Sequence, residues 1–246
     1  MILLLFGVLA THSQMLQKLH IKQSRLLPVL HNLDPGVAAR TVSLLGAHMN
    51  DVIPACSVSL RHASAMDALK ESVRIRAENE YGLSHDRIAV GISTAVSEIQ
   101  VLDAIHSGAK YISTMYHVKS LLDIARTCGT PMLSGVSSLE GAYEAIEDGT
   151  DALKIFPSSK VAPSELRNLL DSLRLTYGTS FMDSIPIIVA GGVKEESISE
   201  YISAGATGFA VGYDCHDVRT LSTFPTRVRS MTEYINRCFD AQALNT

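Results

Sequence analysis

The stretch 152–157, Ala-Leu-Lys-Ile-Phe-Pro, places a lysine in the middle of a short apolar run that ends at a proline. Side chains alternate across a β-strand, so Ala152, Lys154 and Phe156 are expected on one face of a strand. A lysine that faces a barrel interior loses hydration, which lowers its pKa and leaves more of it as the free amine. A free amine can attack a carbonyl carbon and form a Schiff base, whereas a lysine at an exposed strand tip stays charged and solvated.

Short apolar runs alternate with amphipathic, helix-like segments from Arg25 onward. The apolar runs lie at 26–30, 52–58, 87–92, 110–113, 131–134, 152–156, 185–190 and 207–211. The helix-like segments lie at 35–48, 62–81, 95–106, 118–128, 139–147, 163–177 and 195–203. Strand followed by helix, repeated through the chain, predicts a parallel α/β fold. An uninterrupted series of eight favours a single, closed, eight-stranded (β/α)8 TIM barrel over an open sheet.

The domain organisation predicted from this pattern is simple. Residues 25–246 form the barrel domain, with a C-terminal helix at about 225–244, and residues 1–24 form an N-terminal extension or extra helix. A secretory signal has basic residues before its apolar segment, and the apolar segment 2–10 has none. The segment is also too short to span a bilayer. A weak signal or anchor is the alternative. We expect a cytoplasmic protein with no membrane partner.

Composition narrows the classes of partner. The net charge of −4 and the lack of a long run of Lys and Arg argue against a nucleic-acid partner. The four cysteines are spread through the chain without the spacing of a metal site, which is typical of reduced thiols: Cys56, Cys128, Cys215 and Cys238. We expect no metal ion and no cofactor.

In a (β/α)8 barrel the active site lies at the C-terminal ends of the strands. The polar residues that follow the predicted strands include one lysine and one arginine, and no cluster of acids and histidines at metal-ligand spacing. Arg61 shares its strand face with Ser57 and Ser59, which places it at the barrel mouth. This set of side chains favours chemistry that uses an amine rather than a metal.

The chain resembles the family of 2-keto-3-deoxy-6-phosphogluconate (KDPG) and 4-hydroxy-2-oxoglutarate (KHG) aldolases, from about Arg25 to Asp214. The Lys-Phe-Phe-Pro strand of the family is similar to Lys-Ile-Phe-Pro at 154–157. The family's Glu-Val-Thr-Leu-Arg, Gly-Ala-Gly-Thr and Pro-Gly-Val/Ile segments resemble 57–61, 91–94 and 134–136. Its Thr-Gly-Gly and Gly-Gly-Ser loops resemble 190–192 and 212–214.

The resemblance implies a class I pyruvate aldolase in which Lys154 forms the Schiff base. Arg61 and Thr94 would hold the carboxylate of an α-keto acid, and Phe156 would shield the imine. Backbone amides of Gly191 and Gly192 would offer a phosphate site at a helix N-terminus. The resemblance also implies a homotrimer. A solvated charge for Arg61, core packing for Phe156 and an ordinary turn for the glycine pair are the alternatives.

Three departures from the family pattern bear on activity. The family's acid-base glutamate is Ser57 here, its phosphate-loop threonine is Ala190, and its last serine is Asp214, whose carboxylate would repel a phosphate. Serine cannot act as a general base near neutral pH without an activating neighbour. The candidate substitute bases are His31 and His117, with Tyr116 as a weaker one, and for any single one of them a loop residue that hydrogen-bonds water is the favoured alternative.

Two functions from different classes follow. The first is a class I lyase, an aldolase or a decarboxylase-like relative, that acts on a small 2-keto acid and, as an aldolase, releases pyruvate and an aldehyde. The second is a catalytically impaired member that binds a keto acid or sugar acid without turnover, because Ser57 replaces the glutamate. A phosphate enzyme similar to thiamine-phosphate synthases is a third alternative, which the 154–157 strand disfavours.

Overall fold

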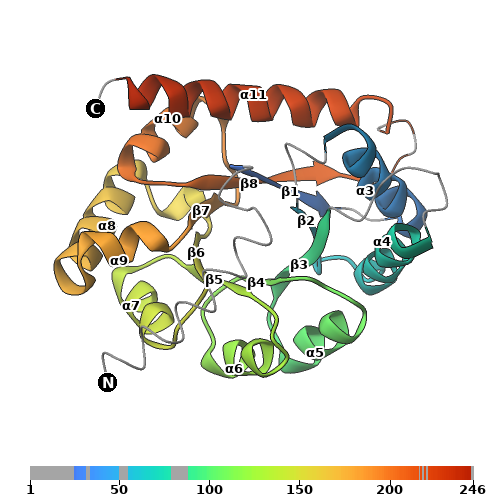
Figure 1. Ribbon diagram of the computed structural model, residues 1–246, viewed down its shortest axis with the longest axis horizontal. Coiled ribbons are helices and arrows are strands. Elements are labelled where there is room, and N and C mark those ends of the chain that lie inside the picture. Colours follow the sequence, from blue (N-terminus) through green and yellow to red (C-terminus); the bar gives the residue numbers. More distant parts are fainter. Residues whose placement is uncertain are drawn as a thin grey trace.

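The computed structural model describes residues 25–31, 34–49, 55–78, 88–215, 217, 219 and 221–244. Within these ranges, eight parallel strands pair in chain order and close into a barrel through β8 and β1 (Figure 1). The strands are β1 (Leu26–His31), β2 (Ala55–Ser59), β3 (Ala89–Ala95), β4 (Ile112–Thr114), β5 (Met132–Val136), β6 (Ala152–Ile155), β7 (Ile187–Ala190) and β8 (Gly208–Asp214). The predicted (β/α)8 barrel is confirmed.

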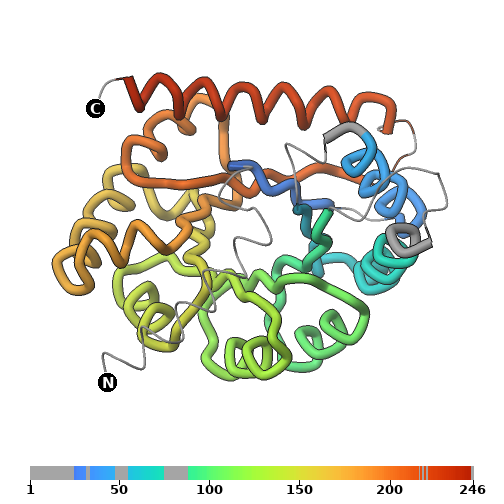
Figure 2. Tube along the Cα trace, viewed as in Figure 1, coloured from blue at the N-terminus to red at the C-terminus, as the bar shows by residue number. Residues whose placement is uncertain are grey.

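Helices surround the barrel in the order of the chain. They are α3 (Pro35–Met49), α4 (Ala65–Glu78), α5 (Glu98–His106), α6 (Lys119–Thr127), α7 (Leu139–Glu147), α8 (Pro163–Tyr177), α9 (Thr179–Ser184), α10 (Glu195–Ala204) and α11 (Phe224–Ala243), with a short 3-10 helix η1 (Ser158–Lys160). The sequence pattern does not predict α9 or η1. Figure 2 shows α11 as a long tube beside α10, and α11 also contacts α3 and β1. The extension expected at residues 1–24 lies outside the described residues.

Local sequence signals set several helix starts. Ser97 and Ser138 accept hydrogen bonds from backbone N–H groups in the first turns of α5 and α7. The Asp34 carboxylate accepts one from the Val37 N–H at 2.9 Å, at the start of α3. These side chains satisfy N–H groups that have no partner within the helix, which fixes where each helix begins.

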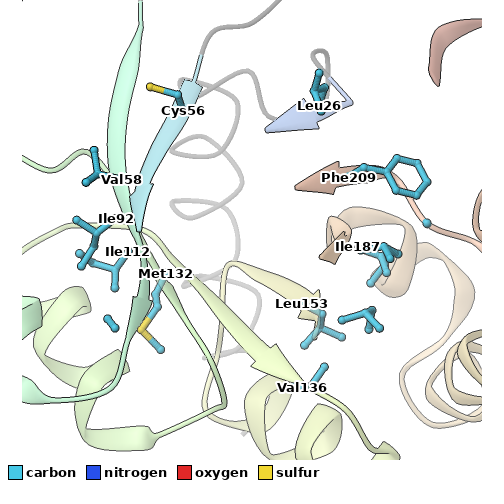
Figure 3. Packing of buried hydrophobic residues seen from close by; sticks show 14 of the residues in the cluster. Leu26, Cys56, Val58, Ile92, Ile112, Met132, Val136, Leu153, Ile187 and Phe209 are labelled. Atoms are coloured by element: carbon cyan, nitrogen blue, oxygen red, sulfur yellow. The ribbon is translucent and has the colours of Figure 1, made fainter. Parts of the chain in front are cut away.

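The core has two layers, one on each side of the barrel wall. The outer layer fills the space between strands and helices and includes Leu153, Ile155 and Phe209; Figure 3 shows part of it. The inner layer lies inside the barrel and includes Ala152 and Tyr111, with Phe156 packed against it. Residues 152–156 therefore alternate across the wall as predicted.

None of the helices in the described part of the chain is both long enough and apolar enough to cross a bilayer.

Candidate active site

A cavity of about 530 Å³ lies inside the barrel and at the C-terminal ends of its strands. A cavity of this size is in the range that holds a small-molecule ligand. Its lining brings together most of the predicted site residues from five different strands or the turns after them: Lys154, Arg61, Thr94, Phe156, Gly191, Gly192 and His31. The fold thus gathers residues that are far apart in the sequence at one end of the barrel.

Lys154 lies on β6, where it pairs in register with Gly135 on β5 and Ile188 on β7. The lysine is 5% exposed. The pKa of Lys154 is lowered from 10.5 to about 7. Burial is the larger cause of this shift, and the positive charge of Arg61 is the smaller one. Near neutral pH a large fraction of this side chain is therefore an uncharged amine, the form that can attack a carbonyl carbon.

Phe156 follows Lys154 by two residues, and its ring centre lies 4.8 Å from the lysine Nζ. The ring packs against Gly191, where a Cβ would come within 2.6 Å of it and the φ angle is +80°. A glycine at this position therefore provides both the backbone conformation and the space for the ring. Ser158 also holds this loop, because its Oγ donates to the Gly191 carbonyl at 2.7 Å.

Gly192 has a similar conformation, with a φ angle of +81°. The two glycines lie between β7 and α10, whose first turn carries Glu195 and Glu196. Acidic residues in a first turn interact favourably with the helix dipole, and they add negative charge to the helix end that the resemblance assigns to a phosphate.

Thr94 interrupts the regular pairing of β3 with β4, where the register shifts between Ser93 and Ala95. Its φ angle of +71° is unusual for a β-branched residue. Such backbone strain is of order 1–3 kcal/mol and is concentrated at functional sites. The Thr94 Oγ1 lies 3.2 Å from the Oγ of Ser59, so the strained turn presents a pair of hydroxyls near the cavity.

Arg61 lies just after β2, and its guanidinium carbon is 5.8 Å from the centre of the Phe156 ring. No carboxylate among the described residues is within ion-pair distance of Arg61, which leaves the guanidinium available to a carboxylate ligand. Ser93, also in the cavity wall, has a buried Oγ that lacks a hydrogen-bond partner within the described part of the chain. Both groups are suited to bind an acidic, polar ligand.

His31 ends β1 and faces the cavity across Gly212, where a Cβ would lie 2.7 Å from the histidine ring. Burial first, and Arg61 second, lower the pKa of His31 below its usual 6.5, while Asp214 acts in the opposite direction. A second cavity, of about 240 Å³, adjoins His31 and Arg61 and is also lined by Ser59, His62 and Asp214. His31 is neutral near pH 7 and can accept a proton from a ligand.

The structure does not bring His117 to either of these cavities. Its ring is 6% exposed, with Nε2 2.9 Å from Asp148 Oδ2 and Nδ1 3.2 Å from Ser134 Oγ. The order Ser134, His117, Asp148 resembles a hydrolytic triad, but Ser134 lines neither of these cavities and accepts a hydrogen bond from Thr150. A serine without access to a substrate cannot act as a nucleophile, so this group stabilises the fold. His117 is held between Ser134 and Asp148, away from the cavity that contains Lys154.

Ser57 lines the cavity that contains Lys154, and it has a partner that the sequence does not reveal. Its Oγ lies 2.8 Å from the hydroxyl of Tyr111, a fully buried residue directly before β4. Strand alternation offered a signal, because Tyr111 and Ser113 share the inward face, but the pattern does not reveal which hydroxyls meet.

Comparisons with known proteins agree with this geometry. A family model described as "KDPG and KHG aldolase" matches residues 18–223. The chain is 28% identical over 131 residues to the 2-dehydro-3-deoxy-6-phosphogalactonate aldolase of Escherichia coli (strain K12), a match covering 53% of this chain and 60% of that relative.

Two solved structures share the fold. One, described as "Native KDPGal structure", has a TM-score of 0.68 at 22% identity, with 90% of this chain and 96% of that chain covered. The other is a KDPG aldolase from Legionella pneumophila with pyruvate captured as a covalent carbinolamine intermediate. It has a TM-score of 0.63 at 18% identity, with 91% and 97% of the two chains covered.

Proposed function

We propose that this chain, which belongs to the KDPG and KHG aldolase family, is a class I aldolase that cleaves a small 2-keto acid to pyruvate and an aldehyde. The observation that carries the proposal is the environment of Lys154. This lysine is buried in the barrel, its pKa is lowered to about 7, and the cavity around it also contains Arg61 and Thr94.

The proposed reaction begins when the neutral Lys154 amine adds to the keto carbon of the substrate. Loss of water from the resulting carbinolamine gives an iminium ion, which accepts the electron pair of the carbon–carbon bond that breaks. The Phe156 ring, 4.8 Å from the amine, limits the access of water to the imine. Cleavage leaves an enamine on Lys154, and in the reverse direction this enamine adds to an aldehyde.

Substrate orientation would come from the carboxylate. Arg61 can form a charge-assisted, forked pair with it, and the Thr94 hydroxyl can donate a further hydrogen bond. The carbinolamine described for the Legionella pneumophila enzyme is the kind of adduct that we propose for pyruvate at Lys154.

Cleavage also needs a base, which removes the proton from the hydroxyl group on the carbon that becomes the aldehyde. His31 is suited to this role because it faces the cavity and its pKa is lowered. The imidazole would accept the hydroxyl proton as the aldehyde forms, and would return it in the condensation direction.

The substrate can carry a phosphate or a hydroxyl group at the end distant from the keto acid. Gly191 and Gly192 provide a loop before a helix N-terminus, which suits an anion. Asp214 in the adjoining cavity opposes a second negative charge there and suits the hydroxyl groups of an unphosphorylated sugar acid. We therefore propose 2-keto-3-deoxy sugar acids as the substrate class.

The experiment is a pyruvate-release assay over matched phosphorylated and unphosphorylated 2-keto-3-deoxy acids, with Lys154→Ala as the control. Turnover of one or more acids that is lost in Lys154→Ala supports the aldolase. Saturable binding without pyruvate release in the wild-type protein favours the alternative of a catalytically impaired binder, for which the replacement of glutamate by Ser57 is the supporting observation.

The family resemblance also suggests an oligomeric state and a cellular location for this protein. We expect a homotrimer in the cytoplasm, and light scattering coupled to gel filtration measures the assembly directly. A mass of about three chains supports the trimer, and a mass of one chain contradicts it.

A further inference from the structure

We propose that the hydroxyls of Ser57 and Tyr111 form a relay that moves protons to and from the intermediate on Lys154. The inference rests on the proposed Schiff-base function and adds the group that handles its protons. Ser57 is the catalytic residue of the pair, because it lines the cavity with Lys154. Tyr111 acts through Ser57, from which its hydroxyl is 2.8 Å away.

Neighbouring strands build the pair into the barrel. Ser57 on β2 is in register with Gly91 on β3, and Tyr111 lies directly before the next strand, β4. A Cβ at Gly91 would come within 2.5 Å of the Tyr111 ring. Because any larger residue at position 91 would displace the ring, the glycine provides the space that lets the phenol reach Ser57.

The chemistry at Lys154 requires a proton donor, and the cavity offers few. None of the described residues that line the larger cavity is Asp or Glu. The charged or imidazole groups there are Lys154, Arg61 and His31, and the first two are assigned to the adduct and the carboxylate. Hydroxyls are the remaining proton carriers on the side of the barrel opposite β6, and a hydroxyl with a second donor behind it can give a proton and regain one.

The first relay step removes water from the carbinolamine. The carbon–oxygen bond breaks, and the departing oxygen takes the Ser57 proton while Ser57 takes the proton of Tyr111. The products are water, the iminium ion on Lys154 and the Tyr111 phenolate. Burial raises the pKa of Tyr111 well above its usual 10, so the phenol enters this step protonated. The positive iminium stabilises the phenolate that forms.

The second step returns the proton. In the pyruvate adduct, the phenolate takes a proton from the methyl carbon through Ser57, and the electron pair of that carbon–hydrogen bond forms the enamine. Tyr111 is then a phenol again and Lys154 carries a neutral enamine, so charge and atoms balance. The reverse of this step starts from the Tyr111 phenol and returns a proton to the same methyl carbon, so the two directions together exchange the methyl protons of pyruvate.

The test compares two signals from the same proteins. Borohydride trapping of pyruvate on Lys154 reports the Schiff base, and exchange of the pyruvate methyl protons with deuterated solvent, followed by NMR, reports the relay. We expect Tyr111→Phe and Ser57→Ala to keep trapping at long reaction times. We expect the same variants to lower the kcat of exchange by about 10²-fold or more, with KM changed by less than about threefold.

Three further variants make the result specific. The double variant Ser57→Ala/Tyr111→Phe should be no slower than the slower single variant, because the two hydroxyls act as one unit. Ser57→Thr, which keeps a hydroxyl, should retain exchange. Tyr213→Phe removes another buried phenol whose hydroxyl has no partner in the described part of the chain, and should exchange at the wild-type rate.

Exchange at the wild-type rate in Tyr111→Phe or Ser57→Ala would overturn the relay, even if trapping proceeds. A parallel rise in KM would overturn it too, because it would show that the pair merely shapes the cavity. Absence of trapping in the wild-type protein is a separate result, which would remove the Schiff-base function itself.

Discussion

The Nζ of Lys154 lies 4.8 Å from the centre of the Phe156 ring, two residues further along the chain. An aromatic face attracts a charged ammonium, whereas loss of hydration favours the neutral amine. The pKa of Lys154 is lowered to about 7, so burial outweighs the attraction of the ring. The guanidinium carbon of Arg61 lies 5.8 Å from the centre of the same ring, so Phe156 is close to both Lys154 and Arg61.

The rate of imine trapping should follow the ionisation of Lys154. Because the pKa is lowered from 10.5 to about 7, the reactive amine is scarce in acid and predominates above about pH 8. The initial rate of trapping with excess pyruvate should rise with pH and reach half of its plateau at about pH 7. A half-maximal rate near the pKa of an ordinary lysine would contradict the buried environment.

Arg61→Gln tests the second cause of this shift. Removing the positive charge should raise the Lys154 pKa, and the midpoint of the trapping curve should move to higher pH. The extent of trapping at low pyruvate concentration should also fall, because the proposed carboxylate partner is lost. Lys160→Gln changes an exposed lysine on η1 and serves as the matched control, with no change in midpoint.

Lys154 should reduce the stability of the fold near neutral pH. Its pKa is about 7 in the folded chain and near 10.5 in the unfolded chain, so the unfolded chain binds more protons between these values and stability rises with pH. Replacing Lys154 by methionine should raise the free energy of unfolding by about 3–4 kcal/mol near pH 7.

The gain in Lys154→Met should shrink by about 3 kcal/mol between about pH 7 and about pH 10. Urea unfolding of both proteins at the two pH values measures this difference and cancels the titration of other groups. A gain that does not depend on pH would show that the lysine is not desolvated in the folded chain.

Thr94 should tolerate glycine better than a threonine in ordinary strand conformation. Its φ angle of +71° is strained, so Thr94→Gly relieves strain while it loses the hydrogen bond with Ser59. We expect a change of less than about 1 kcal/mol in the free energy of unfolding, against a loss of about 2 kcal/mol or more for Thr114→Gly, a buried threonine on β4.

The same Thr94→Gly variant should raise the KM for the keto acid by about tenfold, because the proposed carboxylate site loses a hydroxyl donor. Stability from urea unfolding and KM from steady-state kinetics separate the two effects. An unchanged KM would remove Thr94 from the carboxylate site.

His31 and His117 should affect turnover differently when each is changed to glutamine. His31→Gln should lower kcat for cleavage by about tenfold or more and leave pyruvate proton exchange unchanged, since His31 is assigned to the distal hydroxyl. His117→Gln should leave kcat unchanged and lower the free energy of unfolding by about 1–2 kcal/mol, because it weakens the buried contact with Asp148. Equal loss of turnover in both variants would contradict these assignments.

The barrel was predictable because its signal is repeated. Each apolar run with its following amphipathic segment carries the same information, and errors of a few residues at strand ends do not change the topology. The inward face of β6 was equally predictable, since alternation over Ala152, Lys154 and Phe156 needs no knowledge of distant residues.

Features of the site that depend on three-dimensional packing were not predictable. His117 follows the fourth strand as His31 follows the first, but its ring lies buried against Asp148 rather than in the cavity. The hydrogen bond between Ser57 and Tyr111 joins residues 54 positions apart and depends on the space left by Gly91. The left-handed conformation of Thr94 has no sequence signal, because threonine rarely adopts it.

The central claim is that Lys154 forms a covalent imine with a keto acid. Its most direct test is the intact mass after borohydride treatment with pyruvate, followed by peptide mapping, in the wild-type protein and in Lys154→Ala. We predict one pyruvate-sized adduct per chain, located on Lys154 and lost in the variant. An unmodified wild-type protein between about pH 6 and about pH 9, where the amine is present, would contradict the claim.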